Sequence, residues 1–181
     1  MLDSVQQKFR ELRLKHCAEN IEAILEQGKQ KNLSPMQIIE RLLDLETEKR
    51  RQARILLRFK QSKLLDQPTI DQFDFSFHAS RKKQKNVILG LMDLEFIRQK
   101  KDIVLIGNPG VGKSLLAKTI AYAATQDGIK TLFTSAMDMI NQLIAAQDGH
   151  DLLKKLKTYQ NPDLLVCDEL CKALHNSSYV K

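Results

Sequence analysis

The sequence predicts an α/β fold with a parallel sheet, preceded by a helical N-terminal module. Three observations support this prediction. A short apolar run, Ile103–Ile106, is followed by a glycine-rich loop and then by an Ala/Leu-rich stretch, Leu115–Thr125, with helical spacing. A second apolar run, Leu164–Cys167, ends in two carboxylates. Before residue 65, apolar residues recur mainly every three or four positions. Continuous apolar runs that alternate with helices are typical of a parallel sheet.

The loop after the first apolar run reads Gly107-Asn108-Pro109-Gly110-Val111-Gly112-Lys113-Ser114 and fits G-x-x-x-x-G-K-[ST], the pattern of a phosphate-binding loop. Its glycines allow a tight path in which successive N–H groups face one anion. The helix N-terminus, through Leu115, adds partial positive charge. We expect Lys113 to contact the β- and γ-phosphates of ATP and Ser114 to offer its hydroxyl to Mg²⁺. A P-loop nucleotide-binding fold is therefore favoured over a chance glycine-rich turn.

The second apolar run supplies the companion residues of such a site. Asp168, at the carboxyl end of the strand, is expected to hold the Mg²⁺ shell together with Ser114. Glu169 is expected to orient or deprotonate the attacking water, with Lys113 as the second catalytic group. Cys167 is interpreted as a small apolar strand residue. A zinc site with Cys171 and His175 is disfavoured because a fourth ligand is lacking.

The net charge of +7 is unevenly placed along the 181 residues. Residues 1–101 carry 21 Lys/Arg and 14 Asp/Glu, whereas residues 102–181 carry 8 of each. This distribution predicts a polyanion partner such as DNA or RNA for the first part, with a solvated basic surface as the alternative.

The remaining composition points to the cytoplasm. Three cysteines do not suggest a disulfide framework. No apolar run approaches the roughly 20 residues of a membrane-spanning helix, and the N-terminus has no signal-peptide core. We therefore expect a cytoplasmic protein with no membrane partner.

Two long helices are predicted in the N-terminal module. The first covers residues 4–28 and would end near Gly28. The second begins at Ser34-Pro35-Met36-Gln37, which fits a capping box, and continues to about Arg58. The two would pack as a hairpin, and a third helix could be hidden in this count. The charged run Glu46–Arg51 indicates intrahelical ion pairs, with phosphate contacts as the alternative.

A linker follows at residues 65–85. Phe73, Phe75 and Phe77 alternate with polar residues, so we expect them to anchor the linker to the core; walling the base of a nucleotide is the alternative. The basic cluster Arg81–Lys85 opposes the dipole of a helix predicted from about Asn86 to Gln99, which hints at an outside anion. That helix is expected to turn four residues inward: Val87, Leu91, Leu94 and Ile97.

The part after the loop helix is predicted to continue the α/β order. Gly128 would end the loop helix, Thr131–Thr134 would form a strand, and Ser135 would cap the next helix. A short helix is expected around Asp151–Leu156. The predicted organisation is therefore a basic helical module at residues 1–64, the linker at residues 65–85, and a nucleotide-binding domain at residues 86–181.

This order of features resembles the IstB-type transposition helper ATPases, relatives of the helicase loader DnaC within the AAA+ group. The resemblance covers about residues 10–170, and its specific parts are Asp71–Phe75, Asn108–Ser114 and Leu164–Leu170. It implies an AAA+-like sheet with helices on both faces. It also implies an ATP-driven homo-oligomer on double-stranded DNA that assists a transposase. A DnaC-like helicase loader shares every motif and remains an alternative.

The sequence departs from that pattern after Leu170. The polar sensor, the arginine finger and the lid of the family have no counterpart, and neither has the strand that should separate the two motif strands. We therefore expect the C-terminal part of the AAA+ core to be missing and ATP hydrolysis to be slow or absent. The chain would then be a nucleotide- or DNA-binding fragment without turnover. Its two motif strands would either pair directly or leave a gap for the tail from Cys171.

Overall fold

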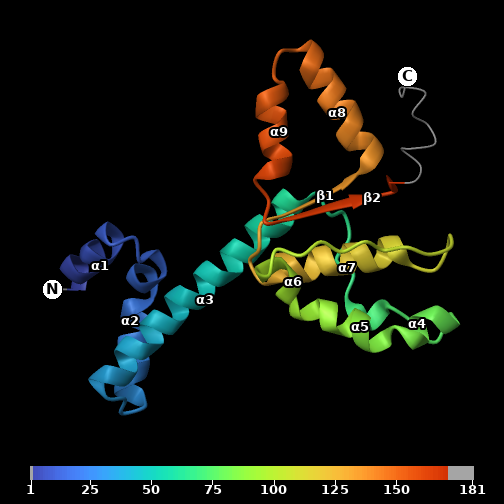
Figure 1. The fold of residues 1–181 in the computed structure, drawn as a ribbon. Coiled ribbons are helices and arrows are strands. Elements are labelled where there is room, and N and C mark those ends of the chain that lie inside the picture. The colour runs from blue at the N-terminus through green and yellow to red at the C-terminus, as the bar shows by residue number, and fades with distance from the viewer. Residues whose placement is uncertain (1, 171–181) are drawn as a thin grey trace. The chain divides into compact units, whose positions relative to one another are not determined.

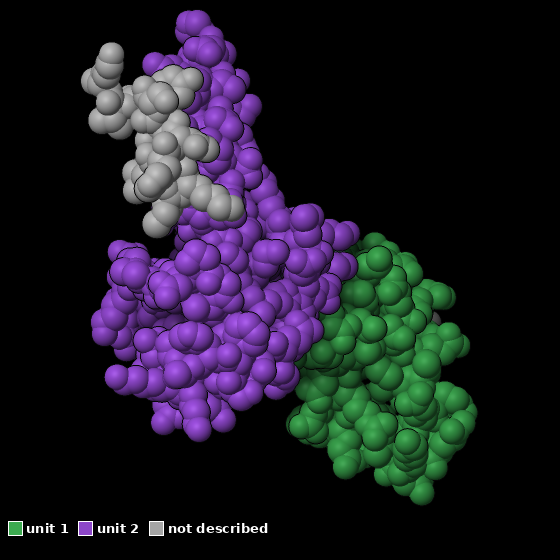
Figure 2. Space-filling view, turned by 90° about the vertical axis from the view of Figure 1, so that its right-hand side faces the viewer, with its two compact units in different colours: residues 1–54 green, residues 55–181 purple. Residues whose placement is uncertain are grey.

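The structure is a computed structural model that describes residues 2–170. The chain divides into two compact units, residues 1–54 and residues 55–181, which are coloured separately in Figure 2. Each unit has a hydrophobic core of its own. Helix α3 (Pro35–Ser62) contributes residues to both units.

The first unit contains α1 (Leu2–Glu11), α2 (Lys15–Gln30) and the first part of α3. The prediction of one helix over residues 4–28 is wrong, because the chain turns at Arg13, whose φ of 59° is left-handed. After this turn Leu14 packs against the core, which is built on four buried residues: Cys17, Ile21, Ile24 and Leu42. The third helix allowed for in the sequence is therefore present.

Gly28 does not end a helix but allows two helices to approach each other. It is buried within α2, which continues to Gln30. A Cβ atom at Gly28 would lie 2.8 Å from Cδ1 of Ile38 in α3. The chain leaves α2 at Asn32, whose φ is 51°, so the prediction that Gly28 is the stop is wrong.

The start of α3 confirms the predicted capping box. The backbone N–H of Gln37 donates to Ser34 Oγ at 3.3 Å, and the N–H of Ser34 donates to Gln37 Oε1 at 2.8 Å. The predicted intrahelical ion pairs are also present. Arg50 Nε lies 2.7 Å from Glu46 Oε1, and Arg51 Nη1 lies 3.7 Å from Glu48 Oε2.

Glu46 has a second role that the sequence did not indicate. Its carboxylate is buried and accepts hydrogen bonds from the backbone N–H groups of His16 at 2.8 Å and Cys17 at 3.0 Å. It therefore caps the N-terminus of α2 from a neighbouring helix. Burial alone would raise the pKa of Glu46, but the hydrogen bonds from Cys17, Arg50 and His16 outweigh burial and lower the pKa.

The second unit contains a small parallel sheet, as predicted. Strands β1 (Thr131–Ser135) and β2 (Leu164–Asp168) pair in parallel, with Thr131 opposite Leu164 and Ser135 opposite Asp168. Helix α7 (Lys113–Gln126) packs against both strands, and α8 (Ala136–Asp148) packs against β1 and against α9 (Leu152–Gln160). In Figure 1, α8 and α9 lie on one side of the strands and α7 lies on the other. This is a helix-rich α/β arrangement.

Local chemistry explains how these elements begin and end. Ser135 closes β1 and caps α8, since its Oγ accepts from the N–H of Asp138 at 3.0 Å. Gly128 follows α7 with a φ of 77°, and its N–H donates to the carbonyl of Thr125 at 3.0 Å. Both predictions are confirmed. Helix α7 contributes to the core of this unit, which contains six buried residues: Phe73, Ile88, Leu94, Leu116, Ile120 and Ala124.

The predicted helix over residues 86–99 is instead broken into short pieces. They are α5 (Lys85–Gly90), a 3₁₀ turn (Leu91–Asp93) and α6 (Glu95–Arg98). The break occurs at Leu94, whose φ of 56° lets its side chain enter the core. Val87, expected to point inward, is 66 % exposed, and Ile88 is buried in its place.

Residues 103–106 form no strand in the described part of the chain, contrary to the prediction. A strand is stabilised by hydrogen bonds to a neighbouring strand, and β2 pairs with β1 rather than with this segment. Val104 is 73 % exposed and Ile106 is 90 % exposed. The two motif segments therefore do not pair directly. The tail from Cys171 lies outside the described residues.

None of the helices in residues 2–170 combines the length and the apolar character that crossing a membrane requires.

Candidate nucleotide-binding site

The loop leads directly into α7, and no side chain in the described part of the chain caps this helix. Gly112 occupies the capping position with a φ of 88°, which is the left-handed region that favours glycine. Helix α7 begins at Lys113, and the N–H of Leu116 makes the first intrahelical bond, to the carbonyl of Gly112 at 2.9 Å. The preceding N–H groups, from Lys113 to Leu115, are therefore of the kind that binds anions at helix N-termini.

The side chain of Lys113 folds back over the loop. Its Nζ donates to the carbonyl oxygens of Gly107 and Asn108, each at 2.9 Å. Pro109 and Gly110 form the exposed tip between these carbonyls and the helix. The loop thus holds one cation beside the uncapped end of α7, which is the charge that a phosphate group requires.

Strand β2 brings Asp168 to the start of α7. Ser114 Oγ donates to Asp168 Oδ1 at 3.1 Å, although the two residues are 54 positions apart. The backbone N–H of Glu169 donates to the same carboxylate oxygen at 2.9 Å, with a φ of 59° at Glu169. A hydroxyl and a carboxylate at this distance are hard oxygen donors of the type that Mg²⁺ prefers. These residues therefore fit a Mg²⁺ ion by their chemistry.

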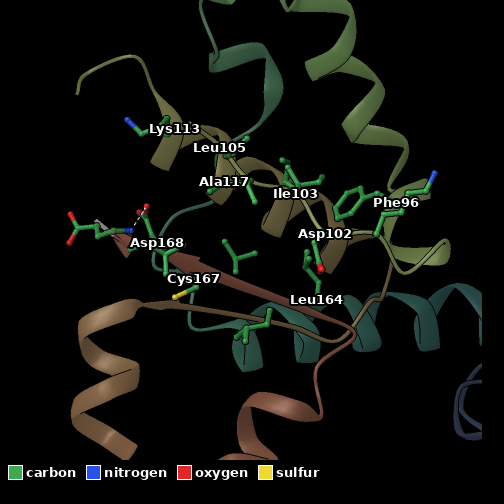
Figure 3. Close-up of a pocket in the computed structure, with 16 residues that line it drawn as sticks. Phe96, Asp102, Ile103, Leu105, Lys113, Ala117, Leu164, Cys167 and Asp168 are labelled. Atoms are coloured by element: carbon green, nitrogen blue, oxygen red, sulfur yellow. Dashed lines mark hydrogen bonds between the residues drawn. The ribbon is translucent and has the colours of Figure 1, made fainter. Parts of the chain in front are cut away.

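A pocket of about 260 Å³ lies between the segment before the loop and strand β2. Figure 3 shows Lys113 and Asp168 towards one end of this pocket and Phe96 and Asp102 towards the other. The side chains between them are largely apolar. Lys113 and Asp168 therefore lie together at the end of the pocket where the loop and the end of β2 meet.

A second cavity, of about 470 Å³, is lined by the loop segment together with Phe73, Arg81 and Gly112, among others. Phe73 is buried, and its ring lies 5.1 Å from the ring of Phe75 in an edge-to-face arrangement. The anchoring role expected for the aromatic residues is thus confirmed for Phe73. Phe77 is 66 % exposed and does not share it.

Sequence reasoning did not identify Arg81 as a neighbour of the loop. The predicted basic cluster begins in α4 (Ala79–Lys83), and within it Arg81 Nε donates to the carbonyl of Val111 at 2.8 Å. Lys82 and Lys83 are exposed. The run of cations was the only signal, and it did not distinguish Arg81 from the lysines.

Cys167 lies half-buried in β2, where burial and the neighbouring Asp168 carboxylate raise the pKa of its thiol. Within residues 2–170 no group of His, Cys, Asp and Glu side chains has the arrangement of a metal site. Cys171 and His175 lie outside the described residues.

The fold and this arrangement are those of a P-loop ATP-binding domain. Residues 7–176 match the family described as "IstB-like ATP binding protein", and the chain belongs to this family.

Similar proteins come from bacterial insertion sequences. A protein of Geobacillus stearothermophilus, described as ATP-binding in insertion sequence IS5376, is 35 % identical over 94 % of this chain and 67 % of its own length. The corresponding proteins of IS232 from Bacillus thuringiensis and IS21 from Pseudomonas aeruginosa are 31 % and 30 % identical. Each match covers 88 % of this chain, but 63 % and 59 % of those proteins. The chain thus spans about two thirds of the length of these relatives.

Proposed function

We propose that this protein binds ATP with Mg²⁺ and uses ATP binding and hydrolysis to assemble on double-stranded DNA, where it assists a transposase. The observation that carries the nucleotide part is the 3.1 Å hydrogen bond between Ser114 and Asp168. It joins the phosphate-loop motif to the carboxylate of β2, two features that are far apart in sequence and are both required by such a site.

Each residue of the site has a proposed role. Lys113 and the N–H groups from Gly110 to Leu115 bind the phosphates, and Ser114 and Asp168 hold Mg²⁺. Bound Mg²⁺ would neutralise charge on the phosphate oxygens. Glu169, directly after Asp168, orients the attacking water.

A titration with fluorescent ATP tests the nucleotide part. We expect Lys113→Ala to weaken binding by about 10–100-fold, because charged hydrogen bonds contribute roughly 1.5–3 kcal/mol each. Asp168→Asn should lower the affinity only in the presence of Mg²⁺. Lys118→Ala is the matched control, because Lys118 is another cation of α7 but pairs with Asp66 at 3.1 Å. An unchanged affinity in Lys113→Ala would show that the loop is not the site.

Slow hydrolysis by these 181 residues stays a prediction. Steady-state phosphate release with DNA and Mg²⁺ present measures it. Turnover of about one per minute or faster, a rate set below the typical enzyme range, would contradict the prediction if Glu169→Gln abolished it.

The DNA part is supported by the placement of charge on α3. Residues 49–62 contain six Lys/Arg and no Asp/Glu. Some of these cations have protein partners, since Arg58 Nε donates to the carbonyl of Gly128 at 3.0 Å and Arg50 pairs with Glu46. Among residues 2–170, no ion pair involves Lys49, Arg54 or Lys60. Such side chains can release counterions from a DNA backbone without losing a protein contact.

Binding to duplex DNA at several salt concentrations tests this part. We expect Arg54→Gln with Lys60→Gln to reduce the log–log salt slope by about 2, close to one per lost phosphate contact. Lys154→Gln with Lys155→Gln, which removes two cations of α9, is the control and should leave the slope unchanged. Equal effects of the two double variants would contradict the assignment to α3.

The transposase and oligomer parts of the proposal rest on family membership and on the relatives named above. Those relatives belong to insertion sequences, which favours a transposition role over the helicase-loader alternative. Co-purification of the protein with a transposase of an insertion sequence, with and without ATP, is the direct test of this partner.

A further inference from the structure

Arg81 connects the phosphate loop to the aromatic segment that precedes it. Its Nε donates to the carbonyl of Val111 in the loop at 2.8 Å, and its Nη1 donates to the carbonyl of Asp74 at 2.8 Å. One planar guanidinium thus spans two backbone segments that are 37 residues apart. Arginine can bridge the two segments because its guanidinium group carries several N–H donors in fixed directions.

Two aromatic rings hold the guanidinium in place. Its Cζ lies 4.4 Å from the centre of the Phe73 ring and 4.7 Å from that of Phe77, both within the range of cation–π attraction. Phe73 is fixed in the core. Arg81 is therefore anchored on the protein side and contacts the loop on the other.

The turn that supplies the Asp74 carbonyl is itself ordered. Asp74 Oδ1 accepts from the N–H of Ser76 at 2.8 Å and from its hydroxyl at 2.7 Å. These hydrogen bonds are the main cause of the lowered pKa of Asp74, to which the charge of Arg81 adds. The turn thus presents the Asp74 carbonyl to Arg81 from a defined position.

The contact with Val111 has a consequence for the loop backbone. In a planar trans peptide the C=O and the following N–H point in opposite directions. Because the carbonyl of Val111 points to Arg81, the N–H of Gly112 points away from it. Arg81 also crowds Gly112, where a Cβ atom would lie 2.4 Å from Nη2. The orientation of this peptide decides whether the N–H of Gly112 can join the other donors at a phosphate.

We propose that Arg81 is a positioning residue that fixes the Val111–Gly112 peptide of the phosphate loop in its anion-binding orientation. The inference rests on the proposed nucleotide function and assigns to it a residue outside the loop motif. A direct contact between Arg81 and the base of the nucleotide is the competing role, and it differs in what it predicts for a ligand that has no base.

Titrations with MgATP and with magnesium tripolyphosphate, which lacks the base and sugar, separate the two roles. For Arg81→Ala we expect both affinities to fall by the same factor, about tenfold, which is the effect of one charged hydrogen bond. Lys82→Ala, which removes a neighbouring exposed cation of α4, should change neither. A loss for MgATP alone would assign Arg81 to the base, and no loss for either ligand would show that the loop does not need it; each overturns the proposal.

A second variant guards against a general loss of folding. Arg81→Lys keeps a cation against the phenyl rings but cannot span both carbonyls. We expect it to retain the thermal melting midpoint of the wild-type protein and still to lose part of the affinity for both ligands. Wild-type affinity in this variant would show that the two hydrogen bonds from the guanidinium group of Arg81 are not needed.

The amide resonance of Gly112 provides a measurement that needs no ligand. We expect it to shift or broaden in the ligand-free Arg81→Lys and Arg81→Ala variants and to be unchanged in Lys82→Ala. An unchanged resonance in both Arg81 variants overturns the proposal. If the wild-type protein bound neither ligand but the Gly112 resonance still responded to Arg81, the proposed function would fail while the positioning contact would stand.

Discussion

At the N-terminus of α2 the carboxylate of Glu46 accepts hydrogen bonds from the backbone N–H groups of His16 and Cys17. At the N-terminus of α7, Gly112 occupies the capping position and no side chain of residues 2–170 caps the helix. Both helices begin with N–H groups that have no partner inside the helix. In α2 a buried anion of the chain satisfies them, whereas in α7 they are open to an anion from outside. The same backbone requirement thus stabilises one unit and, on our proposal, binds a ligand in the other.

The largest effect on stability and on ATP affinity is expected at Gly112, the crowded capping position of α7. Gly112→Ala places a Cβ at a φ of 88° and within 2.4 Å of Arg81 Nη2. Left-handed strain of about 1–2 kcal/mol and overpacking of about 1–3 kcal/mol should add. We expect a loss of roughly 2–5 kcal/mol in stability and, where this distorts the loop, about 10²-fold in MgATP affinity.

Gly110→Ala is the matched control for that variant. Gly110 also has a left-handed φ, of 81°, but a Cβ there would meet no atom of the described residues within 4 Å. Only the strain should remain, about 1–2 kcal/mol in unfolding by urea. Equal effects of the two substitutions would show that Arg81 does not crowd the loop.

The next largest effect is expected when ATP, the proposed ligand, binds at the uncapped N-terminus of α7. ATP at about 100 times its dissociation constant should stabilise the folded state by about 2.7 kcal/mol. Hydrogen exchange should slow in the first turn of α7 and stay unchanged at His16 and Cys17, because Glu46 already satisfies that end. Equal protection of the N-termini of α2 and α7 would show that ATP does not bind at the start of α7.

The substitution Glu46→Gln weakens the cap at the N-terminus of α2. The amide keeps one acceptor oxygen but loses the charge, so we expect the first unit to lose about 1–3 kcal/mol in its free energy of unfolding. Glu48→Gln is the control, because Glu48 is exposed and lies 3.7 Å from Arg51; its loss should stay below about 1 kcal/mol. Similar losses in both variants would contradict the capping role.

The same carboxylate gives a pH dependence of defined sign. The pKa of Glu46 in the folded state lies below its ordinary value. Its contribution is therefore fully present above about pH 4.3, the pKa of an unfolded Glu, and is lost as the pH falls through the folded pKa. Urea unfolding should show a steeper acid loss for the wild-type first unit than for Glu46→Gln. If the stability of the wild-type protein and of Glu46→Gln fell equally with pH, the folded state would not stabilise the ionised form of Glu46.

The smallest effect is expected just before the loop. Val104→Ser and Ile106→Ser alter exposed side chains, so each should change the free energy of unfolding by no more than about 0.5 kcal/mol. Leu105→Ala removes a side chain that packs against the core and should cost about 1–3 kcal/mol. If Val104→Ser lowered the free energy of unfolding as much as Leu105→Ala does, the side chain of Val104 would be buried in solution, as in a strand inside a sheet.

Features with local causes could be predicted from the sequence. The capping box at Ser34 and Gln37, the cap of α8 by Ser135, and the strands around Thr131 and Leu164 depend on residues a few positions apart or on one apolar run. The motif from Gly107 to Ser114 likewise predicted a tight loop at the start of a helix. Their position in the sequence is enough because their partners are neighbours in the chain.

The backbone breaks at Arg13 and Leu94 could not be predicted in the same way. Neither residue is a glycine, and the helical spacing of apolar residues continues across both positions. Each left-handed turn lets a leucine, Leu14 or Leu94, enter a core that other elements build. The energy gained by burying these side chains, not local propensity, selects the turn.

The sequence by itself determined the glycine-rich loop, the helix that follows it and the acidic end of the second motif, because these depend on residue types at fixed short spacings. Only the tertiary structure decided that Ser114 meets Asp168, that Arg81 holds the loop, that Glu46 caps α2, and that residues 103–106 form no strand within the described chain. Each of these depends on a partner at least 29 positions away or, for residues 103–106, on a neighbouring strand. Such partners are brought together only when helices and strands pack.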